Sequence, residues 1–254
     1  MRKLIVRLGQ TKSVIVITLF SWLASVLVTL GVVFIFSRFG RIQDIASHLT
    51  IASLVPLILT PPISWFIIGL FLRIDQLEVK MRDAATYDSL TGLLNRRAFM
   101  EQGNYLFNLA NREHFGFSVL VVDLDQFKTI NDKFGHAAGD KVLESFGKNA
   151  LEFSRKSDLA GRLGGEEFAF ILPNSSADQA WTFAERLHEA VRKTIVEHEN
   201  SEVFCTLSIG IAAFPEDRLI DIEKSLGMAD KAMYRAKENG RNQSVVYSES
   251  MGTG

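Results

Sequence analysis

Two adjacent carboxylates, Glu166 and Glu167, directly follow the glycine pair Gly164-Gly165, between apolar, strand-prone runs at 159–163 and 168–172. A glycine pair between such runs predicts a tight hairpin, because glycine adopts the positive φ angles that a two-residue turn needs. Glycine also lets polar atoms of a ligand approach the backbone closely. On a strand the two glutamates alternate faces, so one of them can point into a site. These residues alone fit either a site for a metal-bound phosphate or an ordinary hairpin with two solvated glutamates.

A further carboxylate, Asp123, stands where an apolar run at 117–122 ends, and this run predicts a buried strand. The end of a strand is where an α/β sheet exposes functional groups. With a carboxylate from the hairpin and the backbone carbonyl of Leu124, Asp123 would form the hard, oxygen-rich site that Mg²⁺ prefers, completed by substrate phosphates. The alternative for Asp123 and the nearby Asp125 is a solvated loop or a helix cap.

Further polar residues follow the strand. Lys128 can neutralise charge that develops on a phosphate, and the amide of Asn131 together with the carboxylate of Asp140 can bind the edge of a guanine. Each of these residues taken singly is more typical of a solvated loop or a helix cap. The chemistry therefore depends on the elements that position them.

The composition narrows the classes of protein. The chain has 254 residues and a formal net charge of −1, without the basic surplus of a general nucleic-acid binder, so no nucleic-acid partner is expected. The first third is apolar, and the remainder is mixed like a soluble domain. The single cysteine, Cys205, lies in an apolar run and is expected to be a small buried side chain in a reducing compartment.

From Asp88 onward the periodicity of apolar residues predicts an α/β domain at 89–248, with a tail at 249–254. The expected helices are 96–111, 139–153, a helix capped by Ser176 that runs to about His198, and 219–239. The expected strands are 117–122, the two hairpin strands, 203–213 and 243–247.

Two uncharged stretches, 14–36 and 49–72, each have the length of a transmembrane helix, so residues 1–72 are expected to be a membrane anchor. Basic residues number four before the first stretch, two between the stretches (Arg38 and Arg41) and three at 73–82. The positive-inside rule therefore predicts a cytosolic N-terminus and a cytosolic α/β domain. The three prolines of the second stretch would kink a membrane helix without forbidding it. Buried soluble helices are the alternative.

Residues 73–88 are expected to be a helical linker. Ile74, Leu77, Met81 and Ala84 recur at steps of three and four, with charged residues between them, which is the spacing of a coiled-coil seam. Such a seam would pair two copies of the chain in parallel. The alternative is a helix that lies on its own domain.

Five motifs occur in order: DSLTGLLNRR at 88–97, DLDQFKTINDKFGHAAGD at 123–140, GGEEF at 164–168, LSIGIA at 207–212 and ADKAMYRAKENGRN at 229–242. With these motifs the chain resembles the GGDEF family of diguanylate cyclases over residues 84–248. The resemblance implies a fold like a polymerase palm or nucleotide cyclase, with a central, mainly antiparallel sheet flanked by helices. It also implies condensation of two GTP molecules into cyclic di-GMP, with release of two pyrophosphates.

The resemblance also implies roles for individual residues. Asp123 and Glu166 would bind Mg²⁺ through their side chains and Leu124 through its carbonyl, with two ions per active site, for which Mn²⁺ can substitute. Glu166 would help to deprotonate the attacking 3′-hydroxyl, with Glu167 beside it, and Lys128 would stabilise the transition state. The implied substrate-binding residues are Asn131, His136, Asp140, Gly164, Gly165, Lys237 and Arg241.

A dimeric active form and product inhibition are also expected. One domain holds one GTP and the product has two phosphodiester links, so the active form would be a homodimer anchored among the lipids of the bacterial inner membrane. Arg155 and Asp158, at the RxxD spacing before the hairpin, together with Arg186, resemble the family's product-inhibition site; ordinary surface charges at a helix end are the alternative. A GGDEF domain that only binds GTP or cyclic di-GMP, as a signalling module, is the alternative function.

Overall fold

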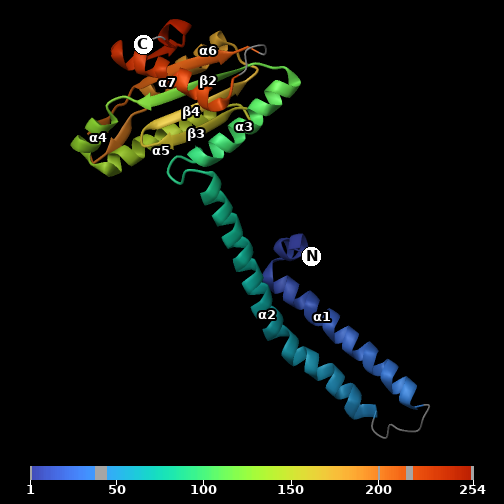
Figure 1. Ribbon diagram of the computed structural model, residues 1–254. Coiled ribbons are helices and arrows are strands. Elements are labelled where there is room, and N and C mark those ends of the chain that lie inside the picture. The colour runs from blue at the N-terminus through green and yellow to red at the C-terminus, as the bar shows by residue number, and fades with distance from the viewer. Residues whose placement is uncertain (1, 38–44, 200, 216–219, 253–254) are drawn as a thin grey trace. The chain divides into compact units, whose positions relative to one another are not determined.

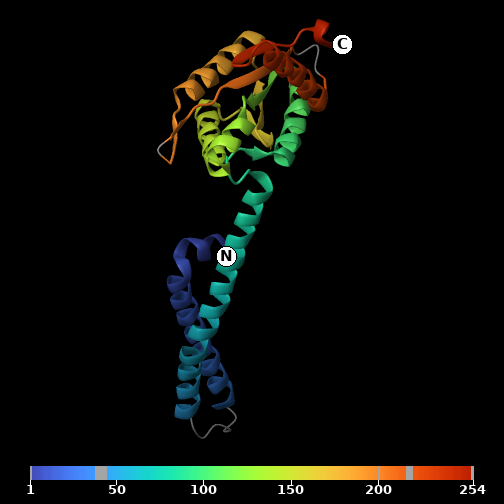
Figure 2. The same cartoon turned by 90° about the vertical axis from the view of Figure 1, so that its left-hand side faces the viewer.

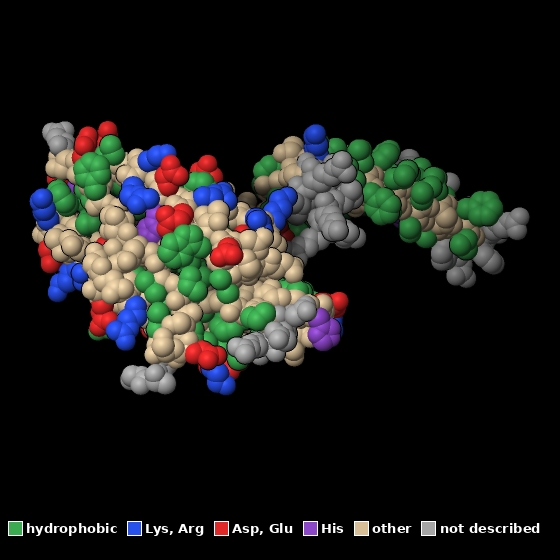
Figure 3. Space-filling model, turned by 90° about the horizontal axis from the view of Figure 1, so that it is seen from above, with side chains coloured by type: hydrophobic (Ala, Val, Ile, Leu, Met, Phe, Trp, Pro, Cys, Tyr) green, Lys and Arg blue, Asp and Glu red, His purple; other side chains and the backbone are tan. Residues whose placement is uncertain are grey.

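The computed structural model describes residues 2–37, 45–199, 201–215 and 220–252, and the chain divides into two compact units, Met1–Arg82 and Asp83–Gly254. The basic residues Arg38 and Arg41 lie outside the described residues. In the space-filling view, hydrophobic side chains dominate the visible surface of the first unit, whereas charged side chains of both signs are interspersed over the second (Figure 3). This contrast matches the change of composition along the sequence.

The first unit is a pair of long helices, α1 (Arg2–Ser37) and α2, which spans Ile45–Thr86 (Figures 1 and 2). Gly9 interrupts α1 with a φ of 74°. The stretches Gly9–Ile35 and His48–Glu78 are long and apolar enough to cross a membrane, and only 6% and 17% of their most apolar windows are buried. The helices α1 and α2 contain the predicted stretches 14–36 and 49–72. Their length and composition are weak support for a membrane location.

Polar side chains join the two helices of this unit. The Gln10 side-chain amide donates to the Trp65 carbonyl at 3.0 Å, and the Ser21 and Thr60 hydroxyls lie 3.3 Å apart. Pro56, Pro61 and Pro62 all lie inside α2, which continues to Thr86, two residues short of the end of the predicted linker. Ser64 donates to the Thr60 carbonyl at 2.6 Å, so a side chain binds a backbone group beside the two adjacent prolines.

The second unit is built on a mixed, mainly antiparallel sheet, as the family resemblance implies, and its strand order is β1-β3-β4-β2-β7-β8. The strands of this sheet are β1 (Leu94–Asn95), β2 (Phe117–Leu124), β3 (Leu159–Gly164), β4 (Glu167–Pro173), β7 (Leu207–Phe214) and β8 (Gln243–Val246). Every residue of β2 is buried, because helices cover both faces of the sheet. This central strand ends at the functional residues.

Five helices cover the sheet: α3 (Arg96–Glu113), α4 (Phe127–Phe134), α5 (His136–Phe153), α6 (Ala177–Lys193) and α7 (Ile222–Glu238). The odd-numbered residues of β2, such as Val119 and Val121, pack in the cluster that contains residues of α3 and α7. The even-numbered residues, such as Leu120 and Val122, pack in the cluster of α4, α5 and α6. The two groups of helices lie on opposite faces (Figures 1 and 2).

Several boundaries differ from the sequence expectation. The helix that Ser176 caps ends at Lys193 rather than near His198, because the β-branched run Thr194-Ile195-Val196 disfavours helix. Val196–His198 (β5) and Ser201–Val203 (β6) instead form a two-stranded hairpin, and the next sheet strand starts at Leu207 rather than at Val203. Ser176 does cap α6, through a complete capping box with Gln179.

Two helical segments were not expected. The helix α4 buries only Phe127 and Ile130, so its periodicity covers a single turn and is hard to recognise in sequence. It is bounded by Gln126 at φ 56° and Gly135 at φ 82°, and α5 then begins at His136 rather than at Gly139. At the C-terminus, Glu249–Gly252 forms a short 3₁₀ helix within the expected tail.

Close packing of α7 on the sheet depends on Gly210 in β7. A Cβ atom at this position would collide with the backbone of Ala229 and Met233 in α7. We predict that Gly210→Ala lowers the free energy of unfolding by about 1–3 kcal/mol, because backbone cannot move aside as a flexible side chain can. Gly227→Ala is the control; a Cβ there meets nothing, so that variant should gain about 0.5–1 kcal/mol of helix propensity. Denaturant unfolding of both variants measures the difference, and equal stabilities would contradict the prediction.

Candidate active site

The glycine hairpin has a different register from the one expected. Gly164 pairs with Glu167, after a bulge between Arg162 and Gly164, so the two turn residues are Gly165 and Glu166. Gly165 adopts a φ of 51°, which explains the need for glycine there. Glu166 therefore lies in the turn and only Glu167 is on a strand, which corrects the expectation that both alternate along one strand.

The ends of β2 and of the hairpin are joined directly. The Leu124 amide donates to the Glu166 carbonyl at 3.2 Å, and Asp123 pairs with Glu167 in the antiparallel register of β2 and β4. Directly paired residues project from the same face of a sheet, so Asp123 and Glu167 are neighbours on the α7 side. The predicted meeting of Asp123 with the hairpin carboxylates is confirmed.

A cation already faces Asp123. The Lys237 ammonium, from α7, lies 2.7 Å from Asp123 Oδ2, and the Asp123 side chain is only 8% exposed. Burial raises the pKa of Asp123; Lys237 opposes this shift, whereas the charges of Glu166 and Glu167 add to it. Three acids close to one another make a site that favours added positive charge.

The other predicted residues form a second group on α4 and α5. A Cβ at Gly139 would collide with the Asn131 side-chain oxygen, so this glycine lets the Asn131 amide lie directly against α5, next to Asp140. Lys128 and His136 are exposed in the first turns of α4 and α5. Gly139, whose role the sequence did not reveal, therefore places the Asn131 amide against the turn of α5 that also carries Asp140.

Arg241 lies in the turn between α7 and β8. Gly240, Arg241 and Asn242 all have positive φ angles, of 108°, 64° and 48°, which is an uncommon conformation for the last two residue types. Such backbone strain persists only when its surroundings fix it. The restraint is Asp125, whose Oδ2 accepts a hydrogen bond from the Asn242 amide at 3.0 Å.

Asp125 is a structural centre that the sequence analysis did not identify. Its side chain is buried and also accepts hydrogen bonds from the hydroxyls of Thr206 and Ser208, both at 2.6 Å. It therefore ties the end of β2 to the start of β7 and to the turn that carries Arg241. The only hint of this role in the sequence is that Asp125 is the second acid of an Asp-Leu-Asp run at the end of a predicted buried strand.

A separate group lies after α5. The Arg155 amide donates to Asp158 Oδ2 at 2.8 Å, and the Asp158 amide returns a bond to the Arg155 carbonyl at 3.0 Å, closing a turn. The Arg186 guanidinium lies over the Phe153 ring, 4.9 Å from its centroid, two residues before this turn. Arg155 and Asp158 of the predicted inhibitory site therefore share one turn, and Arg186 contacts the last residue of α5 just before it. Arg155 and Asp158 also line a hollow bounded by Tyr87 and Leu94.

The sheet order and its covering helices define an α/β domain of the palm-like class. The family described as "Diguanylate cyclase, GGDEF domain" matches residues 85–243. The chain belongs to this family of GGDEF-domain diguanylate cyclases.

Individual relatives agree with the assignment. An uncharacterised Bacillus subtilis protein, YhcK, is 43% identical over 168 residues, covering 65% of this chain and 46% of its own length. Diguanylate cyclase A of Treponema denticola is 36% identical, covering 68% of this chain and 47% of its own. The chain thus spans about half the length of these relatives. The coiled coil and GGDEF domain of Caulobacter crescentus DgcB, solved with c-di-GMP, gives a TM-score of 0.65 at 27% identity, covering 70% of this chain and 94% of that one.

The restraint by Asp125 gives a testable expectation. Asp125→Ala should lower the free energy of unfolding by about 2–4 kcal/mol, because two hydroxyls and one amide lose their buried acceptor. Asp230→Ala, which removes an exposed carboxylate of α7, should stay within about 0.5 kcal/mol of the wild type. Chemical denaturation measures both variants. Equal stability of the two variants would show that the Asp125 hydrogen bonds do not hold these elements together.

Proposed function

We propose that the domain is an active diguanylate cyclase that condenses two GTP molecules into cyclic di-GMP and releases two pyrophosphates. The observation that carries the proposal is the acidic group of Asp123, Glu166 and Glu167 beside the Gly164-Gly165 backbone, in a domain that matches this family. An acidic group next to accessible backbone suits a metal-bound triphosphate better than an uncharged ligand.

The donor set fits Mg²⁺. Asp123 and Glu166 would bind it through carboxylates and Leu124 through its carbonyl, all hard oxygen donors, with substrate phosphates completing the shells of two ions; Mn²⁺ can take their place. Among the described residues, no three His, Cys, Asp or Glu side chains form a metal-holding group by themselves. When bound, the metal lowers the pKa of a ribose hydroxyl and neutralises phosphate charge.

The protein's own groups would then act as follows. Glu166 takes the proton of the 3′-hydroxyl, whose oxygen forms a bond to the α-phosphorus of the other GTP; the bond from that phosphorus to the bridging oxygen breaks, and pyrophosphate leaves. Glu167 adds a second carboxylate next to Glu166. Lys128 stabilises the negative charge that develops on the phosphate oxygens in the transition state. Lys237, which forms an ion pair with Asp123 in the structure, would bind a substrate phosphate instead when GTP is present. Arg241 would bind the phosphates together with Lys237.

The substrate would be held at both ends. Asn131 and Asp140 hydrogen-bond the guanine edge, His136 lies beside it, and Gly164 and Gly165 form the floor under the phosphates. Gln126 provides no side-chain cap for α4, so the amides of the first turn can also face phosphate oxygens. Each GTP attacks the α-phosphorus of the other in this way, and the two bonds together close the product ring.

Closing the ring requires a second domain, so we propose a homodimer. Ile74, Leu77 and Met81 of α2 are exposed apolar residues at the spacing of a coiled-coil seam, whereas the Ala84 side chain lies outside the described residues. The two apolar helices would anchor the dimer in the inner membrane with the N-terminus and catalytic domain in the cytosol. Anchoring raises the effective concentration of the partner domain.

Removing the proposed base tests the activity. Glu166→Gln keeps the shape of the side chain but not its basicity, so cyclic di-GMP formation from GTP and Mg²⁺ should fall by about 10²–10⁴-fold. Adding this variant to wild type should also depress the wild-type rate, because a mixed dimer contains only one complete half-site. Chromatographic detection of the product measures both effects.

The matched control is Glu223→Gln, which changes an exposed glutamate of α7 and should leave the rate unchanged. A wild-type protein that binds GTP or cyclic di-GMP but forms no product would favour the signalling-module alternative. A wild-type rate that Glu166→Gln does not change would refute the role of Glu166.

We also propose that Arg155, Asp158 and Arg186 bind cyclic di-GMP and limit its synthesis, because the guanidinium groups of the two arginines can bind guanine edges and phosphates and the Asp158 carboxylate can accept hydrogen bonds from a guanine. Arg155→Ala should raise the concentration of cyclic di-GMP that gives half-inhibition by about tenfold or more, equivalent to about 1.4 kcal/mol. Product-inhibition curves, each normalised to the uninhibited rate of the same variant, measure the change. Arg192→Ala, on the same helix as Arg186, is the control, and equal curves for the two variants would refute the site.

A further inference from the structure

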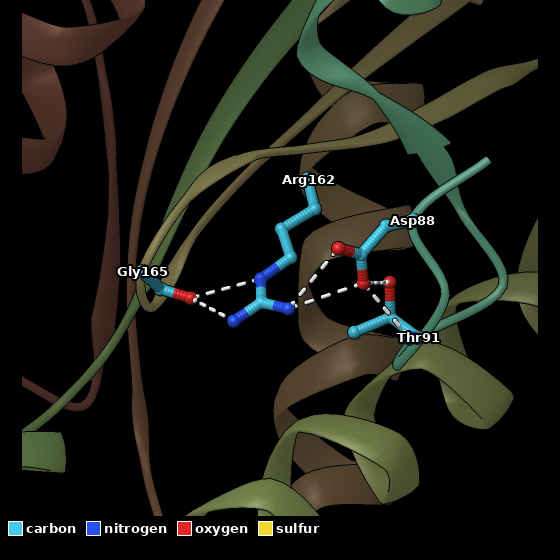
Figure 4. A network of polar contacts seen from close by, with 4 residues as sticks. All are labelled: Asp88, Thr91, Arg162 and Gly165. Carbon is cyan, nitrogen blue, oxygen red and sulfur yellow. Dashed lines mark hydrogen bonds and ion pairs between the residues drawn. The ribbon is translucent and has the colours of Figure 1, made fainter. Parts of the chain in front are cut away.

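Arg162, on β3, connects the glycine turn to the segment that follows α2 (Figure 4). Its Nε and Nη2 donate to the Gly165 carbonyl at 2.9 and 2.8 Å. Its Nη1 donates to both carboxylate oxygens of Asp88, at 3.1 and 3.2 Å. The guanidinium therefore holds a backbone group of the proposed GTP site on one side and a carboxylate on the other. The side chains of Arg162 and Asp88 are only 16% and 23% exposed, so solvent screens the contact weakly.

Asp88 is itself held firmly. Its Oδ1 accepts hydrogen bonds from the Thr91 amide at 2.9 Å and the Thr91 hydroxyl at 2.7 Å, and its own amide donates to the Leu93 carbonyl at 2.8 Å. Thr91 is buried against α5, where Gly147 leaves no room for a Cβ. Burial acts to raise the pKa of Asp88, but the bonds from Thr91 and Arg162 outweigh it and lower the pKa, so the carboxylate is ionised at neutral pH.

The glycine turn needs such a support. Gly164 and Gly165 have the most conformational freedom of any residue type, and a Cβ at either would meet nothing, so no side-chain packing fixes them. In the described structure the turn is held through Gly165 by Arg162 and through Glu166 by the Leu124 amide. These two attachments hold the peptide groups before and after the Glu166 Cα, and so they fix the direction of the Glu166 side chain.

We propose that Asp88 and Arg162 are positioning residues for the reaction: they hold the Gly165 carbonyl and thereby aim Glu166 and the phosphate-binding backbone. This inference rests on the proposed function of the hairpin and assigns its support to a residue two positions beyond the end of α2. The clamp formed by Asp88, Arg162 and Gly165 thus fixes the glycine turn to the hydrogen-bonded segment 88–93.

Three variants of the full chain test the proposal. Arg162→Gln removes the charge and the two-sided contact, Arg162→Lys keeps the charge but offers one nitrogen, and Asp88→Asn keeps an acceptor for Thr91 but loses its charge. We expect Arg162→Gln to lower kcat/KM for GTP by about 10- to 100-fold, as for other displaced catalytic groups, with a smaller loss in Arg162→Lys. Hydrogen exchange of the 163–168 backbone should be faster in both.

The double variant Asp88→Asn/Arg162→Gln should be no worse than Arg162→Gln alone, because the two residues act through one contact. Arg112→Gln is the matched control: Arg112 is an exposed arginine paired with Glu113, and its loss should change neither kinetics nor exchange. Thermal unfolding identifies variants that fail to fold, in which case Arg162→Lys decides.

Arg162 variants with unchanged exchange at 163–168 and unchanged kcat and KM would overturn the proposal, even if their melting temperature fell. The exchange measurement needs no turnover. If the wild type forms no cyclic di-GMP, the proposed function fails, and the clamp is still decided: faster exchange in Arg162→Gln supports it, and unchanged exchange refutes it.

Discussion

The arrangement of the GGDEF domain depends on one buried carboxylate, Asp125. The hydroxyls of Thr206, just before β7, and Ser208, in β7, converge on it together with one backbone amide from the turn before β8, at 2.6 to 3.0 Å. A buried charge is tolerated only when its hydrogen bonds are satisfied, so these three donors must stay together. The strained turn at 240–242 is thereby fixed, and with it the end of α7 that carries Lys237. Asp123, two residues earlier, pairs with Glu167 at this same end of β2.

Much of this organisation could be predicted from sequence, because the motifs are long and their order is specific. The central strand, the hairpin, the Ser176 cap and the meeting of Asp123 with the hairpin glutamates follow from apolar runs, glycine and capping chemistry. The short helix α4 and the β5–β6 hairpin were missed, since one helical turn and two three-residue strands carry too little periodicity. The turn itself was placed one residue too early, because a bulge before Gly164 shifts the register.

The contacts that support the site were harder to predict than the site itself. Asp125, Arg162 and Gly139 act through partners far away in the chain or through the absence of a side chain, and single-sequence patterns report neither. An arginine inside an otherwise apolar strand, and an aspartate three residues before a threonine, were the local signs of the Arg162–Asp88 contact.

The hydrogen bond between Asp125 and Asn242 spans 117 residues of sequence and has a consequence for the order of events during synthesis. Asp125 directly follows β2, whereas Asn242 directly precedes β8, so all the strands between them are synthesised before this bond can form. A contact between residues so far apart in sequence must first offset the entropy of closing the intervening loop. The Asp125 carboxylate therefore gains its full set of donors only after the turn at 240–242 has been synthesised and has docked on the sheet.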